Sequence, residues 1–265
     1  MQLDTIHINF IDELNHDVSR ASNRVLPTYQ YYSKICEFFK FFDLDIKTFD
    51  LQRLSQKFKR QFSNGIYVEI KTFALKGQSS IPEIKLCSIQ FKGVFFLKIG
   101  YTKLQEFLAQ YHVAFNMSVS KVEIALDINK DFVFESMKLA LKHRASFIKM
   151  KSPKFIFNFS NKNYESLSIE NTLNILKVYS KSEELNLKYN AEKKFLYYSK
   201  NLISKTEPIT RVEVGFKNKQ HINQKTILDI IKMSESDYSL SVFKEFFSKI
   251  EILKKSDLKS EIKKH

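Results

Sequence analysis

Three segments of the chain alternate apolar and polar residues with the two-residue period of a β-strand, and this alternation constrains the fold more than any other feature. The segments are Lys121–Asp127 (KVEIALD), Leu176–Lys181 (LKVYSK) and Ile209–Phe216 (ITRVEVGF). Successive side chains of a strand point to opposite faces of a sheet, so each segment buries one face and presents polar groups on the other. We therefore expect a sheet with helices packed on its apolar face and a polar working face on the other side.

Hydrophobic periodicity and turn signals predict the remaining elements. Further strands are expected at Thr5–Phe10, Ile66–Leu75, Ile84–Phe91, Val94–Ile99 and Phe155–Phe159, with a hairpin turn at Lys92-Gly93. Helices are expected at Thr28–Phe42, Thr102–His112, Phe132–His143, Ala191–Ile203, Thr226–Met233 and Ser241–Lys254, and residues 49–58 also have helical spacing. Hairpins together with strand–helix–strand units predict an α+β fold around a mainly antiparallel central sheet.

The domain organisation follows from this order of elements. Residues 1–60 form an N-terminal strand and helical region, residues 61–220 contain the sheet, and residues 221–265 hold the C-terminal helices and a basic tail. The chain has only 5 Gly and 4 Pro, and no long linker rich in Pro, Gly or Ser separates these regions. We expect one compact unit.

Composition narrows the classes of function. The 265 residues carry 43 basic and 29 acidic side chains, a formal net charge of +14, which favours a polyanionic partner: nucleic acid first, an anionic membrane surface second. Two cysteines cannot form a disulfide framework. No signal peptide and no apolar run of about 18 residues is present, so we expect a cytoplasmic protein without a membrane span. No phosphate-binding glycine-rich loop is present, which argues against an ATPase.

If the three alternating segments are neighbouring strands, their polar groups gather on one face and can perform phosphodiester chemistry. Carboxylates on adjacent strands can hold magnesium or manganese, and we expect Gly215 to leave room beside Glu213 for a metal or a close nucleic-acid backbone. A tyrosine hydroxyl can attack phosphorus, and a nearby Lys or Arg can stabilise the phenolate or the phosphorane. The alternative is an ordinary half-exposed sheet whose polar side carries salt bridges. The side chains concerned are Glu123, Asp127, Tyr179, Lys181, Arg211 and Glu213.

The three segments resemble, in order and rough spacing, motif strands of the trans-acting Rep proteins, which initiate rolling-circle replication of plasmids and some phages. KVEIALD is similar to the Rep strand R-x-D-h-A-h-D, where h is apolar; LKVYSKSEE is similar to h-R-h-Y-x-K-x-x-E; and TRVEV is similar to h-R-h-E-h. The resemblance spans residues 118–217. It implies recognition of a replication origin in double-stranded DNA, metal-dependent nicking by a tyrosine and a retained 5′-phosphotyrosine.

The resemblance also implies roles for individual residues. Tyr179 would be the nucleophile, and Asp127 and Glu213 would be metal ligands, with Glu123 a further candidate. The chain departs from the family at Lys121 and Lys177, where Arg is usual, and at Glu123, where Asp is usual. Four further tyrosines are candidate nucleophiles should Tyr179 not be the one: Tyr164, Tyr189, Tyr197 and Tyr198.

Catalytic and non-catalytic functions both remain open from the sequence. The first hypothesis is the tyrosine nickase, in which Lys181 and Arg211 assist Tyr179, with a host helicase to separate strands and a second copy of the chain as a candidate partner. The second is a DNA-binding initiator or regulator without chemistry, and the third is a structural or partner-binding protein. Contacts to DNA are expected from basic side chains on the strands and in the tail: Lys121, Lys177, Lys254, Lys255 and Lys259.

Overall fold

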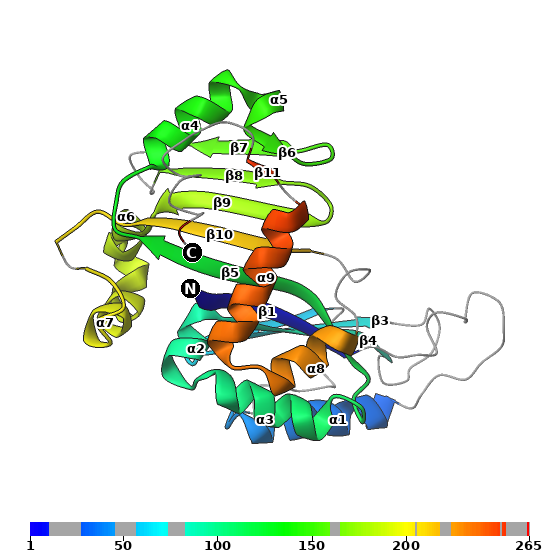
Figure 1. The fold of residues 1–265 in the computed structure, drawn as a ribbon. Helices are drawn as coiled ribbons and strands as arrows, with labels where there is room; N and C mark the ends of the chain where they lie inside the picture. Colours follow the sequence, from blue (N-terminus) through cyan, green and yellow to red (C-terminus); the bar gives the residue numbers. More distant parts are fainter. Residues whose placement is uncertain are drawn as a thin grey trace. The chain divides into compact units, whose positions relative to one another are not determined.

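The structure is a computed structural model that describes residues 1–10, 28–45, 57–73, 83–159, 165–204, 206–217, 224–249, 251–252 and 264. These residues form an α+β fold around a nine-stranded antiparallel sheet with the strand order β2-β3-β4-β1-β5-β10-β9-β8-β7 (Figure 1). The predicted fold class is confirmed. Among the helices of the described residues, none combines the length and the apolar character that crossing a membrane requires.

Contacts within the chain divide it into two compact units, which we describe separately. The first unit comprises residues 1–5, 121–221 and 233–265, and the second comprises residues 6–120 and 222–232. Strands β1 and β5 each contribute residues to both units.

The second unit has an aromatic core between strands and helices. The rings of Phe42, Phe91 and Phe95 pack against one another with centroids 4.8 to 5.7 Å apart, and Phe38 and Phe107 join them from two helices. All five side chains are buried, which stabilises the unit by removing large apolar surfaces from water. Its elements are β1 (Gln2–Phe10), α1 (Thr28–Phe41), β2 (Lys57–Gln61), β3 (Ile66–Phe73), β4 (Glu83–Lys92), α2 (Gly93–Lys98), α3 (Tyr101–Tyr111) and α8 (Gln224–Lys232).

The first unit carries the three alternating segments on adjacent strands (Figure 1). Helix α9 packs on the apolar side of β10, where Phe246 contacts Phe216 with ring centroids 6.0 Å apart. The Phe132 amide preceding α4 donates to the Thr210 hydroxyl on that same side. The elements are β5 (Met117–Ile128), α4 (Val133–Lys142), α5 (Arg144–Phe147), β6 (Ile148–Lys149), β7 (Lys154–Asn158), β8 (Ser166–Glu170), β9 (Asn174–Ser180), α6 (Lys181–Asn186), a 3₁₀ turn (Lys188–Asn190), α7 (Ala191–Ser199), β10 (Thr210–Phe216), α9 (Glu235–Lys249) and β11 (Glu251–Ile252).

Two elements differ in type from the sequence prediction. The predicted helix Ser241–Lys254 is wrong at its C-terminal end, because α9 ends at Lys249 and Glu251–Ile252 form strand β11, which pairs with β6. The predicted strand Val94–Ile99 and its hairpin turn are wrong, because Gly93–Lys98 forms helix α2. Three consecutive apolar side chains of α2 are buried, so this segment lacks the alternation expected of a strand with one exposed face. The backbone at the start of α2 also packs closely against Gly65. A Cβ on Gly65 would lie 2.3 Å from the Phe95 nitrogen, so this position requires glycine. Of the segment 49–58, residues 49–56 lie outside the described residues, and residues 57 and 58 begin strand β2.

A further difference concerns Gly215 on β10. The sequence suggests that this glycine leaves room beside Glu213 for a ligand. Instead, a Cβ at position 215 would lie 2.5 Å from the backbone oxygen of Val122 and 2.9 Å from Cγ of Glu123. Gly215 therefore permits the close approach of two strands rather than opening a space.

Gly215→Ala should lower the free energy of unfolding by about 1–3 kcal/mol, because the added methyl group must push backbone atoms of β5 away. Urea unfolding at pH 7 measures this change. Ser168→Ala on β8 is the control, and it should change the free energy by less than about 1 kcal/mol. Equal stability of Gly215→Ala and the unmodified protein would contradict the packing account.

Candidate functional site

The three predicted strands are direct neighbours, with β10 between β5 and β9. The antiparallel register places Arg211 opposite both Asp127 on β5 and Tyr179 on β9. Two residues further along β10, Glu213 lies opposite Lys177. Residues directly opposite each other in an antiparallel pair share a face of the sheet, so these side chains meet on one face.

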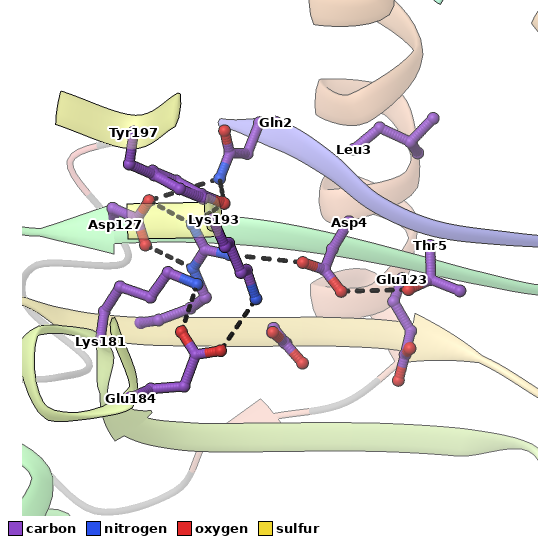
Figure 2. A network of polar contacts seen from close by, with 12 residues as sticks. Gln2, Leu3, Asp4, Thr5, Glu123, Asp127, Lys181, Glu184, Lys193 and Tyr197 are labelled. Atoms are coloured by element: carbon purple, nitrogen blue, oxygen red, sulfur yellow. Dashed lines mark hydrogen bonds and ion pairs between the residues drawn. The ribbon is translucent and has the colours of Figure 1, made fainter. Parts of the chain in front are cut away.

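Arg211 is fully buried and is held by groups from three other elements. Its Nε and Nη2 donate to the two carboxylate oxygens of Asp127 at 2.6 and 2.5 Å, and its Nη1 lies 3.3 Å from Oδ1 of Asp4 on β1. Nη2 also donates to the hydroxyl of Tyr197 on α7 at 2.8 Å, as does Gln2 (Figure 2). Burial alone would lower the pKa of Arg211, but Asp127 raises it well above its usual value. The guanidinium is therefore permanently charged.

Tyr179 belongs to a chain of polar contacts on the same face. Its hydroxyl donates to Oε1 of Glu213 at 2.5 Å. Nζ of Lys177 donates to Oε2 of Glu213 at 3.0 Å and to Oε1 of Glu123 at 2.9 Å, and Lys121 lies 2.8 Å from the other oxygen of Glu123. The two glutamates on adjacent strands are thus joined through one ammonium group.

The environment separates the proton affinities of these groups. Burial raises the pKa of Tyr179 well above its usual value, and the Glu213 carboxylate raises it further. Burial likewise raises the pKa of Glu213. Burial opposes ionisation of Glu123, but Lys177 and Lys121 more than offset it and lower the pKa of this carboxyl. At neutral pH Tyr179 keeps its proton. Of the two carboxylates, Glu213 accepts a proton more readily than Glu123.

A second polar cluster joins α6 and α7. The predicted strand position of Lys181 is wrong, because β9 ends at Ser180 and Lys181 is the first residue of α6. Nζ of Lys181 is fully buried and donates to Oε2 of Glu184 at 2.7 Å, and Nζ of Lys193 donates to Oε1 of the same carboxylate at 2.9 Å (Figure 2). The Lys181 ammonium also lies over the ring of Tyr197, 4.7 Å from its centroid. Burial, with the nearby charge of Arg211, lowers the pKa of Lys181 to about 7. This amine therefore changes charge near neutral pH.

The carboxylates predicted to hold a metal have all their oxygens engaged by the protein. Both oxygens of Asp127 accept from Arg211, both oxygens of Glu123 pair with lysines, and Glu213 accepts from Tyr179 and Lys177. Within the described part of the chain, no three His, Cys, Asp or Glu side chains lie close enough to share an ion. The Lys177 ammonium lies between the two glutamates, where a shared divalent cation would have to bind, so the residues as arranged do not fit one. The metal site stays a prediction, and we derive no chemical step through it.

Several members of this site were not singled out from the sequence. Asp4 and Gln2 come from β1, and nothing local relates them to strands more than a hundred residues away. Helix α6 does carry a signal, since Ser180 and Glu183 have the spacing of an N-terminal capping box, and the Ser180 hydroxyl accepts from the Glu183 amide at 3.3 Å. That signal would have placed Glu184 on a helix beside the predicted Lys181.

The remaining predicted residues are distributed between the site and the rest of the chain. Lys121 and Lys177 are partly exposed and belong to the network around Glu123. The tail residues Lys254, Lys255 and Lys259 lie outside the described residues, as does Tyr164. The three tyrosines that could replace Tyr179 as nucleophile and lie within the described residues differ in exposure: Tyr197 is buried against Arg211, Tyr189 is exposed, and Tyr198 is half-buried on α7.

Comparisons of this chain with family models, with curated proteins and with solved structures found no match.

Arg211→Met should lower the free energy of unfolding by about 3–5 kcal/mol, because it leaves Asp127 and Asp4 as unpaired carboxylates in a mostly buried site. Urea unfolding at pH 7 measures the loss. Arg60→Met on β2 removes a guanidinium that stacks on the ring of Phe62, and it should cost less than about 1 kcal/mol. If Arg211→Met and Arg60→Met lost similar free energies of unfolding, the buried network would contribute no more to stability than an exposed guanidinium does.

Lys181→Met should change how stability depends on pH. The folded-state pKa of about 7 lies below the usual 10.5, so between these values the unfolded chain binds more protons, and stability from this group rises with pH. The stability of the variant relative to the unmodified protein should therefore fall by on the order of 2 kcal/mol between pH 6 and pH 9. Urea unfolding at both pH values measures it, with Lys194→Met as the control. If the difference in free energy of unfolding between the variant and the unmodified protein did not change with pH, the lowered pKa of Lys181 would be contradicted.

Proposed function

We propose that the chain is a replication initiation protein that binds origin DNA and nicks one strand through Tyr179. The observation that carries this proposal is the 2.5 Å hydrogen bond from the Tyr179 hydroxyl to Glu213, which Lys177 holds from its other side. A hydroxyl, a base within hydrogen-bond reach and a third group that orients the base form the arrangement that activates nucleophiles. The ordered resemblance of the three strands to Rep proteins supports the same chemistry.

The chemical step is a transesterification. The Tyr179 oxygen attacks the phosphorus of a DNA phosphodiester while its proton passes to Glu213, whose raised pKa suits a general base. The bond from phosphorus to the 3′-oxygen breaks, and this oxygen takes a proton from solvent. Arg211, opposite Tyr179 in the register, supplies positive charge beside the phosphorane. The product is a 5′-phosphotyrosine on the protein and a free 3′-hydroxyl.

The net charge supports DNA as the substrate. An excess of 14 positive charges attracts a polyanion, and Lys121 and Lys177 remain partly exposed beside the glutamates. Strand separation beyond the nick would require a helicase, which we propose is supplied by the host. A second copy of the chain remains a candidate partner.

The exposed fraction of Tyr179 favours a second candidate, a DNA-binding initiator or regulator without chemistry. Only 6% of this side chain is exposed, and its hydroxyl already has a carboxylate partner. In this candidate the polar network stabilises the sheet, and DNA is held by exposed lysines alone. The two candidates differ in one product, the covalent adduct.

Tyr179→Phe removes one oxygen atom and separates the candidates. The unmodified protein, incubated with supercoiled DNA carrying the cognate origin, should form a nicked circle with protein attached to its 5′ end, and the variant should form at least about 100-fold less, because the attacking oxygen is gone. DNA affinity should change less than about threefold, because the ring and the surrounding charges remain. Adduct is measured by denaturing gel electrophoresis of internally labelled DNA, and Tyr67→Phe is the control.

Two results would contradict the nickase. Normal nicking by Tyr179→Phe would exclude this nucleophile, and absence of nicking by the unmodified protein on every origin fragment of its replicon would favour the non-catalytic candidate. Parallel reactions with manganese and with a chelator test the predicted metal. Glu213→Gln should abolish the adduct both with manganese and with a chelator, since an amide cannot accept the tyrosine proton.

A further inference from the structure

A second surface of the first unit has a regular arrangement of aromatic rings. Phe155, Phe157 and Phe159 alternate along and just beyond β7, the strand at the end of the sheet order. The centroids of neighbouring rings lie 6.3 and 6.2 Å apart, and their planes are inclined by only 12° and 10°. Alternate residues of a strand are about 6.6 Å apart, so the spacing follows from the backbone. We call these three residues the phenylalanine ladder.

The ladder differs from the aromatic contacts of the protein core. In the second unit, the rings of Phe38, Phe91 and Phe107 meet at 69° to 78° and are fully buried. Such edge-to-face packing is the usual arrangement when rings fill a core. The ladder rings are nearly parallel, Phe155 and Phe157 are half-buried, and 52% of Phe159 is exposed. Core packing alone does not explain parallel rings that are partly open to solvent.

Positive charge accompanies the ladder. The guanidinium carbon of Arg144 lies 6.0 Å from the ring centroid of Phe155 and 5.7 Å from that of Phe157. Arg144 is itself exposed. Lys154 at the start of β7 is also exposed, but strand alternation places it on the opposite face of the sheet from the ladder, where Glu170 lies across from it. One exposed guanidinium from α5 thus lies beside two rings of the ladder.

We propose that the phenylalanine ladder binds an unpaired strand of nucleic acid, with bases stacking on the rings and phosphates pairing with Arg144. Base stacking on aromatic side chains combined with a basic path for the backbone is the general mode of single-strand binding. Charge complementarity distinguishes this occupant from an apolar peptide, which would gain nothing from the exposed guanidinium of Arg144. The surface binds an unpaired strand whether or not Tyr179 cleaves DNA.

The test compares two labelled probes of equal length, oligo(dT) and an abasic oligonucleotide with the same phosphates. Fluorescence anisotropy of the full-length chain should show that Phe157→Leu and Phe159→Leu each weaken oligo(dT) binding by about 5-fold or more. Binding of the abasic probe should change less than about twofold, because the charges remain. Phe195→Leu on α7 is the matched control, since 70% of Phe195 is exposed outside the ladder.

The outcomes separate this proposal from its competitors. Equal loss for both probes, or unchanged oligo(dT) binding in the variants, would overturn base stacking. A change from dimer to monomer in sedimentation, without a change in oligo(dT) binding, would assign the ladder to self-association and overturn the proposal. Phe159→Leu keeps the test valid if Phe157→Leu unfolds, because Phe159 is largely exposed. Nicking is measured separately on duplex DNA. A protein that does not nick could therefore still pass or fail the oligo(dT) binding test.

Discussion

The burial of the Arg211 guanidinium is the interaction on which the rest of the first unit depends. This group stays charged, so once water is removed it needs anions and oxygen acceptors at hydrogen-bond distance. Asp127 from β5, Asp4 from β1 and Tyr197 from α7 supply them, across as many as 207 positions of sequence. Removal of Asp127 would leave the buried guanidinium with only the more distant carboxylate of Asp4 as counter-charge, which is costly. The guanidinium therefore holds three strands and a helix in one arrangement.

The charges around Arg211 also balance, and this balance bears on the proposed chemistry. With every group in its usual ionised form, the connected clusters contain five carboxylates and five cations, so a phosphodiester would bring one uncompensated negative charge. Protonation of Glu213, which burial favours, removes one negative charge. Proton transfer from Tyr179 to Glu213 leaves the total charge unchanged, because the negative charge moves from the carboxylate to the attacking oxygen and then to the phosphorane. Arg211, which lies opposite Tyr179, is the cation beside that charge. The members are Asp4, Glu123, Asp127, Glu184 and Glu213, with Lys121, Lys177, Lys181, Lys193 and Arg211.

Alternation in the sequence was enough to predict which side chains share a face, because the period of a strand is fixed by its backbone. It correctly predicted the face that carries Tyr179 and Glu213. It could not predict that Lys177 would lie between two glutamates, since this depends on the register of three strands and on side-chain length. Nor could it find Asp4, whose partners are remote in sequence. The error at Val94–Ile99 has a related cause: a short apolar run fits a strand or a helix, and the packing of Phe95 decides between them.

The two proposed surfaces lie on opposite faces of the same sheet. Phe157 is paired with Leu167, which is buried on the helix-covered side, whereas Lys177 and Tyr179 point to the other side. Three strand spacings of about 4.8 Å separate β10 from β7, roughly 14 Å in total. Because β7 is the last strand in the sheet order, a chain bound on the ladder can pass around this edge without crossing the sheet. The geometry thus allows one nucleic acid strand to contact the ladder while a duplex occupies the polar face, and it predicts no competition between the two.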